Sequence, residues 1–462
     1  MKKAIAVVAG VVVVAYLVSP LVIGLIAQRQ YPETLKALNV GAPEWQPGPF
    51  HLGYRHSSAD STLTIPVSGS QPLVIHLHHR ITQGLGSDLS IMEVTTTPTV
   101  KGTTKAQLDR LFGGKRPLVV DTRIFADGHY TSTITAAAIT NRSLPGEPTV
   151  HLAFAGLAGT VSGTFHPRSA SYRLTSPGFE LLSDKTHLRI AANGLRLSGD
   201  VHVPRPWLRL GEGRFSMDKV VFAAAGQPAT EVDGLRLTAK EQREADGLGF
   251  RYDIHMARLS GPPALKVTNL ALEVAGHHLD EKSTEQFARR LAAISRMGLP
   301  AAQVGPMLHD ALQQVAGGFL AHSPEVGIRR LAFDLPTGGV RASVDARFDG
   351  AGFKSVADPD NIQRLSVEAS LKAPAAAVRA LLIGLMRPKA AAYAKAVKPD
   401  ATPAEVAALG VRMADQTLRN LQARQLLQSE GGDYASSLTF RDGALTVNGQ
   451  PMALPALPAS GR

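Results

Sequence analysis

The chain of 462 residues contains no cysteine. This absence excludes disulfide bonds, thiolate catalysis, zinc sites built on cysteine and iron–sulfur clusters. A body without disulfides must be held together by burial of apolar surface and by strand pairing. Hydrophobic residues make up 44% of the chain, which permits a substantial core.

Charged residues are scarce, and acids are scarcer than bases. Charged residues make up 19% of the chain, below the roughly 25% of an average soluble domain. The net charge is +11. A basic surface suits anionic lipid headgroups or nucleic acid. Because no basic stripe is interleaved with aromatics, we expect no nucleic-acid partner and a diffusely basic surface.

Catalytic signatures are also missing. The sequence has no Gly-x-Ser-x-Gly, no His-Glu-x-x-His and no P-loop. Asp358-Pro359-Asp360 is typical of a loop before a strand. We therefore predict a protein that is not an enzyme, with no catalytic, cofactor-binding or metal-binding residue and no cofactor.

Only one long hydrophobic run is present. Residues 4–27 carry no charge, Lys2 and Lys3 precede them, and Arg29 follows. About 20 apolar helical residues cross a hydrocarbon core of about 30 Å. The run exceeds the apolar region of a cleavable signal peptide and has no small-x-small site at its end. We predict that residues 1–29 form an uncleaved, single-pass signal anchor. The positive-inside rule then places the N-terminus in the cytoplasm and the body in the periplasm, at the inner membrane of a Gram-negative cell.

A short juxtamembrane helix is predicted over residues 28–45. From Phe50 to Gly276 the pattern changes to alternating short runs bounded by glycine, serine and proline, which indicates strands. Residues 116–125 and 129–139 flank Asp127-Gly128, a pair favoured in hairpin turns.

A short motif is nearly repeated in this β region. Asn193-Gly194-Leu195-Arg196-Leu197 is followed 40 residues later by Asp233-Gly234-Leu235-Arg236-Leu237, and Asn269 begins a weaker third copy. We predict successive antiparallel strands with the Asn-Gly and Asp-Gly pairs as turns. A repeated β-meander is the alternative.

Helical spacing begins at Asp280, where Ser283 and Gln286 form a capping-box pattern and Gly298 can end the helix. A second helix follows over residues 304–319. After further strands, Pro374 opens a helix whose predicted core-facing residues are Val378, Leu381, Leu382, Leu385 and Met386. Thr402-Pro403-Ala404-Glu405 is a strong start for the last helix.

These patterns predict an α+β fold. An N-terminal transmembrane helix precedes a large, mainly antiparallel β-sheet body, and amphipathic helical pairs are inserted in the C-terminal part. We expect an anchor (1–29), an N-terminal β-rich module (30–145), a β-meander module (146–279), a mixed helix/strand module (280–453) and a disordered tail (454–462).

The last hairpin carries the most specific resemblance, in the stretch Thr439-Phe440-Arg441-Asp442-Gly443-Ala444-Leu445-Thr446-Val447-Asn448-Gly449-Gln450-Pro451-Met452. This phrase, together with Tyr54 and the serines after it, resembles the YdgA-like family of bacterial inner-membrane-anchored proteins, a domain of unknown function. The chain departs from the family at Ile81-Thr82-Gln83-Gly84-Leu85, where the family has Ile-x-His-Gly-Pro. The resemblance implies an envelope location and no established activity.

Two clusters could carry chemistry. His76 and His78 would share one face of a strand, the spacing of a zinc or copper site, although an edge strand with polar outward residues explains them better. His277-His278-Leu279-Asp280-Glu281 lies between a strand and a helix, where acids favour the helix N-terminus.

Residues 374–429 have a basic balance that could face anionic headgroups. Helices that pack on the sheet with solvated lysines and arginines explain the same residues, and we favour that interpretation.

The leading hypothesis is a non-enzymatic, membrane-anchored envelope protein. Its sheet-and-helix surface would bind a lipid-like apolar ligand or a protein partner. The alternative is a structural or assembly protein of the inner membrane that forms homo-oligomers. The second alternative is an envelope hydrolase or metal-binding protein.

Overall fold

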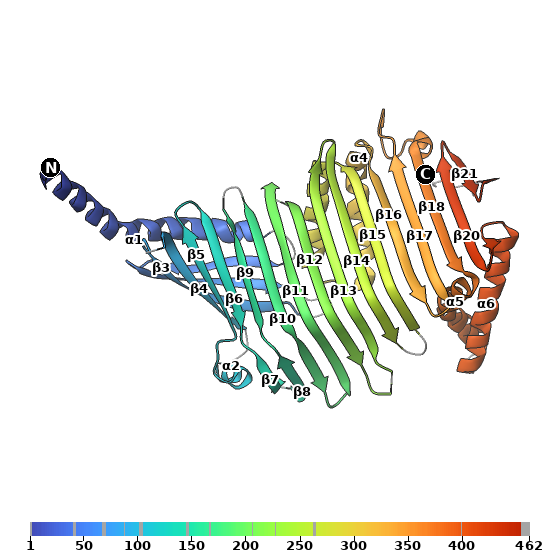
Figure 1. Ribbon diagram of the computed structural model, residues 1–462, viewed down its shortest axis with the longest axis horizontal. Coiled ribbons are helices and arrows are strands. Elements are labelled where there is room, and N and C mark those ends of the chain that lie inside the picture. Colours follow the sequence, from blue (N-terminus) through green and yellow to red (C-terminus); the bar gives the residue numbers. More distant parts are fainter. Residues whose placement is uncertain are drawn as a thin grey trace. The chain divides into compact units, whose positions relative to one another are not determined.

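The structure, a computed structural model, describes residues 2–39, 43–66, 71–86, 88–100, 105–144, 147–165, 168–205, 207–226, 228–261, 265–398 and 400–453 (Figure 1). Within these ranges it describes every side chain except those of residues 2–16, 37–38, 99–100, 105–108, 141, 144, 147–148 and 301. The predicted tail, residues 454–462, lies outside the described residues. The chain forms two compact units. Unit 1 comprises Met1–Ala229, Thr238–Gln242 and Glu281–Ala316, and unit 2 comprises Thr230–Leu237, Arg243–Asp280 and Gly317–Arg462.

The predicted α+β body dominated by antiparallel sheet is confirmed. The helices are α1 (Lys2–Leu38), α2 (Lys105–Phe112), α3 (Glu281–Arg296), α4 (Ala301–Leu320), the 3-10 helix η1 (Pro359–Arg364), α5 (Ala375–Val397) and α6 (Pro403–Ala423). The strands are β1 (Glu44–His51), β2 (His56–Ile65), β3 (Leu73–Gln83), β4 (Ser90–Val100), β5 (Leu118–Phe125), β6 (His129–Ala136), β7 (Ile139–Leu144), β8 (Glu147–Phe154), β9 (Leu157–Thr164), β10 (Ser169–Ser183), β11 (Leu188–Arg205), β12 (Leu208–Ala223), β13 (Thr230–Glu244), β14 (Gly247–Gly261), β15 (Leu265–Leu279), β16 (Glu325–Leu335), β17 (Gly338–Phe348), β18 (Leu365–Pro374), β19 (Gln428–Glu430), β20 (Asp433–Arg441), β21 (Ala444–Val447) and β22 (Gln450–Met452).

In unit 1, strands β1 to β6 pair antiparallel in chain order. Strand β9 then pairs with β6, β10 with β9, β11 with β10 and β12 with β11. The hairpin β7–β8 is an excursion, since β8 pairs with Phe179–Ser183 of β10 while β9 pairs with Ser169–Thr175 of the same strand. The predicted hairpin at Asp127-Gly128 is confirmed, with Gly128 at φ 81° between β5 and β6.

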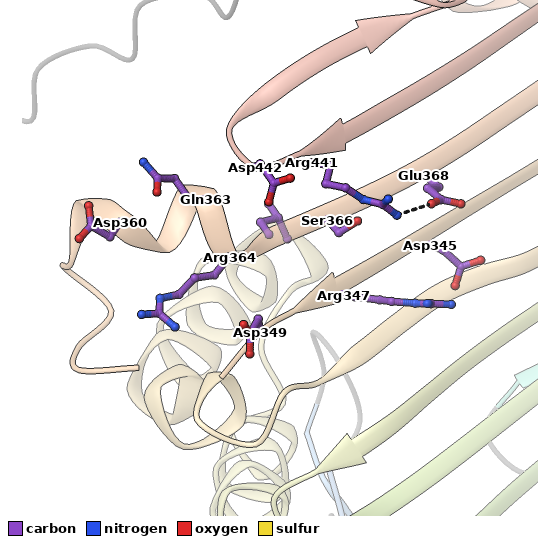
Figure 2. Close-up of a pocket in the computed structure, with 11 residues that line it drawn as sticks. Asp345, Arg347, Asp349, Asp360, Gln363, Arg364, Ser366, Glu368, Arg441 and Asp442 are labelled. Atoms are coloured by element: carbon purple, nitrogen blue, oxygen red, sulfur yellow. Dashed lines mark hydrogen bonds and ion pairs between the residues drawn. The ribbon is translucent and has the colours of Figure 1, made fainter. Parts of the chain in front are cut away.

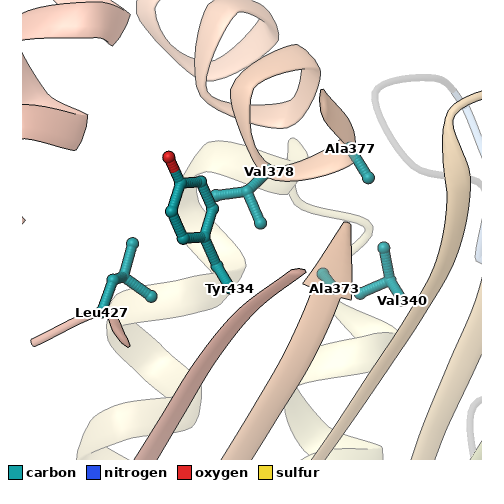
Figure 3. Packing of buried hydrophobic residues seen from close by; sticks show 6 residues of the cluster. All are labelled: Val340, Ala373, Ala377, Val378, Leu427 and Tyr434. Carbon is teal, nitrogen blue, oxygen red and sulfur yellow. The ribbon is translucent and has the colours of Figure 1, made fainter. Parts of the chain in front are cut away.

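In unit 2, strands β14 to β18 pair in chain order, β20 pairs with β18, and β21 and β22 follow. Helices α5 and α6 pack against each other, and α5 also packs against β17, β18 and β20 (Figure 1). A core cluster forms there, made of Val340, Ala373, Ala377, Val378, Leu427 and Tyr434 (Figure 3). Tyr434 of β20 reaches between Val378 of α5 and Leu427, so this cluster attaches the helical pair to the sheet.

The predicted anchor, residues 1–29, forms most of α1. This helix runs to Leu38 without a break, so the separate juxtamembrane helix predicted over 28–45 is not present. The structure describes only the backbone of residues 2–16, which are about half of the anchor. Among the helices of the described residues, none is both long and apolar enough to cross a membrane.

The Asn-Gly pair at 193–194 and the Asp-Gly pair at 233–234 are not turns, which corrects the sequence prediction. Gly194, Gly234 and Asn269 have φ of 66°, 64° and 55°, and they lie inside the long strands β11, β13 and β15. A residue of positive φ within a strand makes a local irregularity without ending the strand. At each position a polar pair lies close by, formed by Arg196 and Asp218, by Arg258 and Asp233, and by Asn269 and Asp334.

The late helices agree with the sequence in part. The capping box of Thr402 and Glu405 is confirmed. Helix α3 begins at Glu281, so Ser283 is a buried residue of its first turn and not its cap. Helix α5 continues through Pro388. Val378 is buried as predicted, but Leu381 and Leu385 are exposed at 39% and 66%, so their predicted core-facing role is wrong.

Candidate functional site

The most extended feature of unit 1 is an uncharged face of its sheet. Residues that pair directly across strands point to the same side, so each line of partners forms a rung. One rung crosses ten strands and consists of Phe50, Ala59, His79, Thr96, Val120, Ile134, Gly159, Leu174, Leu197 and Phe215. The next rung on this side consists of Ser57, Ile81, Val94, Thr122, Ser132, Val161, Tyr172, Gly199 and Gly213. A third consists of Gln83, Met92, Ile124, Tyr130, Gly163, Ala170, Val201 and Gly211. We call the side formed by these three rungs the apolar face.

The opposite side of the same strands is polar. Its rung consists of Ser58, Arg80, Thr95, Asp121, Thr133, Thr160, Arg173, Ser198 and Arg214. Neighbouring residues of a strand point to opposite sides, so the contrast arises within each strand. A sheet that faces water on one side shows this alternation, and its other side requires an apolar partner.

Helix α1 covers the apolar face at β1 to β3. The Tyr31 ring packs on Phe50 and His79, with centroid distances of 5.8 and 5.9 Å, and its hydroxyl donates to the Asp60 carbonyl at 2.6 Å. Gly24 lies against Gln83, because a Cβ at Gly24 would be 2.3 Å from Gln83 Nε2. Among the described residues, Gln83 is the only large side chain that is less than 2% exposed.

His79 is buried in this contact, beneath the Tyr31 ring. Its Nε2 lies 2.8 Å from Ser61 Oγ and its Nδ1 lies 2.8 Å from Thr96 Oγ1, so both ring nitrogens have hydroxyl partners. Burial lowers the pKa of His79 to about 4, an effect that the charge of Asp60 partly opposes. The imidazole is therefore neutral at pH 7, which suits an apolar face.

Further along the same rungs the apolar side chains stay accessible. Val120, Ile134, Val161 and Leu174 are only half-buried, and Leu197 is 37% exposed. Glycines lower the surface between them. The Tyr172 side chain lies over Gly199, where an added Cβ would come within 2.6 Å of the Tyr172 hydroxyl oxygen. This part of the apolar face can accept an apolar molecule without first exposing a packed core.

Unit 2 contains a polar pocket of about 700 Å³ beside η1 and the ends of β17, β18 and β20 (Figure 2). Its charged lining residues are Asp345, Arg347, Asp349, Asp360, Arg364, Glu368, Arg441 and Asp442. All three arginines have partners. Arg441 pairs with Glu368 at 3.4 Å, Arg347 with Glu325 at 3.2 Å, and Arg364 donates to the carbonyls of Ala351 and Gly352. The pocket is an ion-paired surface, so we assign it no ligand.

The structure shows where both predicted histidine clusters lie. His76 and His78 share the exposed outer side of β3, and His78 Nδ1 lies 2.9 Å from Asp60 Oδ1. Sequence reasoning missed Asp60 because the two residues meet only through the β2–β3 register. His277 Nδ1 contacts Glu244 Oε1 at 2.8 Å. Among the described residues, no group of three or more histidine, aspartate or glutamate side chains could hold a metal ion.

The basic helices α5 and α6 are joined by an ion pair. Arg379 Nε lies 2.6 Å from Asp415 Oδ1, and Lys398 contacts Glu405 at 2.5 Å. The guanidinium of Arg379 lowers the pKa of Asp415. Two of the three acids in this region therefore pair with two of its eight lysines and arginines, so the region keeps an excess of bases.

The chain matches the family model described as a bacterial protein of unknown function (DUF945) over residues 1–455. It therefore belongs to this family of uncharacterised bacterial proteins. No curated protein and no solved structure matches the chain.

Proposed function

We propose that this chain is a membrane-attached, non-enzymatic protein of the bacterial envelope that holds a lipid-like apolar ligand on its apolar face. The observation that carries the proposal is the set of three uncharged rungs, whose apolar side chains remain accessible from β5 to β11. The uncharged run of residues 4–27 supports membrane attachment. The resemblance to the YdgA-like family supports the envelope location.

An acyl chain fits this face because it needs no charged or hydrogen-bonding partner. Each buried methylene contributes about 0.8 kcal/mol, so a chain of a dozen carbons gains on the order of 10 kcal/mol before the cost of association. A protein partner would need polar groups to match its own backbone, and the three rungs offer few.

Photocrosslinking in living cells tests the proposal. Benzoylphenylalanine replaces Leu197, which is on the apolar face, or Thr175, which is similarly exposed on the opposite side. We expect lipid adducts, identified by mass spectrometry, at position 197 and several-fold fewer at position 175. Equal yields at the two positions, or adducts to protein alone at position 197, would refute lipid binding on this face.

Assembly through strand pairing has less support. Strand β1 contains Pro47 and Pro49, which have no N–H to donate to an added strand. Proline is one of the devices by which natural sheets avoid pairing with other chains.

A further inference from the structure

One end of the sheet in unit 1 carries an exposed apolar rim. We define the rim by Leu17 and Leu21 of α1, Tyr54 of the β1–β2 turn, and Leu85 and Leu89 of the β3–β4 turn. Their exposed fractions are 54%, 41%, 51%, 46% and 68%. Large apolar side chains so exposed do not contribute to a core, and their clustering at one end indicates a contact surface.

Contacts between the helix and both turns hold the rim together. The Tyr54 hydroxyl donates to the Leu17 carbonyl. Gly84 lies under Pro20, since a Cβ at Gly84 would be 3.3 Å from Pro20 Cγ. The backbone amide of Gln83 donates to the Arg55 carbonyl at 2.9 Å, which joins the two turns.

Leu89 is the most exposed member and has an unfavourable backbone. Its φ is 66°, a conformation that costs a residue with a Cβ about 1–2 kcal/mol. The Asp88 carboxylate fixes the turn by accepting from the Ser90 amide and hydroxyl at 3.1 and 2.6 Å. Folding gains nothing from a leucine here, because its side chain remains in solvent.

The length of α1 identifies the occupant of this surface. Pro20 and Gly24 are buried against the sheet, so only residues 4–19 of the uncharged run extend beyond it. Sixteen helical residues span about 24 Å, less than the roughly 30 Å of a hydrocarbon core. A bilayer crossed by this helix must therefore reach the docked segment, and with it both turns. The exposed Arg55 at the same end suits anionic headgroups.

We propose that the rim lies in the interfacial layer of the bilayer, with Leu85 and Leu89 inserted among the lipids. The inference rests on the proposed membrane attachment and adds that the apolar face of the sheet opens at the membrane surface. Tyrosine is enriched at this depth because its ring is apolar and its hydroxyl polar, as at Tyr54.

The absence of cysteine allows a direct test. Leu89→Cys and Leu85→Cys are labelled with the fluorophore NBD in the full chain and reconstituted in phosphatidylcholine/phosphatidylglycerol vesicles that contain a shallow spin-labelled lipid. Gln71→Cys is the matched control, because it is exposed just before the opposite end of β3, a strand about 33 Å long. We expect at least twofold quenching at positions 85 and 89, and little at position 71.

Flotation of the same vesicles separates the two proposals. Protein that floats without quenching at positions 85 and 89, or with equal quenching at position 71, overturns the rim contact while membrane attachment stands. Protein that does not float overturns both.

Discussion

At the scale of single residues, the contact between α1 and the sheet depends on a few polar atoms inside an apolar face. Ser61 and Thr96 engage the two nitrogens of His79, and the Tyr31 ring packs over it. A buried polar group that loses its partner costs about 1–3 kcal/mol, so these hydroxyls matter despite their size. Protonation of His79 would leave one nitrogen without its acceptor role and place a charge beneath the helix.

Stability should therefore depend on the protonation of His79. The folded-state pKa is about 4, against 6.5 for the free side chain, so between these values the unfolded chain binds a proton that the folded chain does not. The contribution of neutral His79 to the unfolding free energy is fully present above pH 6.5. It is lost as the pH falls toward 4, by an amount on the order of 3 kcal/mol. Chemical unfolding of unit 1, measured from pH 7 to 4, checks this.

The variant His79→Gln is the control, because it keeps a polar side chain and does not titrate. We expect the wild-type protein to lose stability relative to His79→Gln as the pH falls. Parallel pH profiles for the two proteins would contradict the assignment.

At the scale of elements, the helical pair of unit 2 is attached through one aromatic side chain. Tyr434 is 9% exposed within the core cluster, whereas Tyr393 of α5 is 59% exposed (Figure 3). Tyr434→Ala should lower the unfolding free energy of unit 2 by about 3–5 kcal/mol, since it leaves a cavity between α5 and the sheet. Tyr393→Ala should change it by less than about 0.5 kcal/mol. Similar losses in thermal or chemical unfolding would show that the cluster does not attach the helices.

Elements with strong local signals were predictable from sequence. The capping box at Thr402 and the hairpin at Asp127-Gly128 depend on residues a few positions apart, and both are confirmed. The Asn-Gly pair at 193–194 has the same local signal as a turn, yet pairing with β10 and β12 on both sides keeps the strand continuous. Leu381 and Leu385 follow helical spacing as well, but they remain exposed.

Only the alternation of apolar and polar residues along each strand of the apolar face was predictable from the sequence. The sequence indicated which residues alternate along each strand, but not that Ile134 pairs with Gly159 and Leu174 with Leu197. The β7–β8 hairpin intervenes between β6 and β9, so the register that joins them is non-local. Asp60 could not be placed beside His78 because alternation along β2 and β3 does not fix the register between the two strands.

At the scale of the whole molecule, the face and the helical cluster belong to different compact units. Both tryptophans of the chain, Trp45 and Trp207, lie in unit 1. Tryptophan fluorescence therefore reports the unfolding of unit 1, while circular dichroism reports both units. The two probes together show whether the units unfold as one cooperative body.

We expect the units to respond separately to substitution. Gly24→Val places its side chain against Gln83, where even a Cβ comes within 2.3 Å, and should lower the fluorescence midpoint. Leu25→Val, an exposed neighbour in α1, is its control for the helix cost of a β-branched residue. Tyr434→Ala should shift the circular dichroism transition and leave the fluorescence midpoint unchanged. If Tyr434→Ala moves both midpoints together, the two units form a single cooperative body, and events at the rim are then coupled energetically to the C-terminal helices.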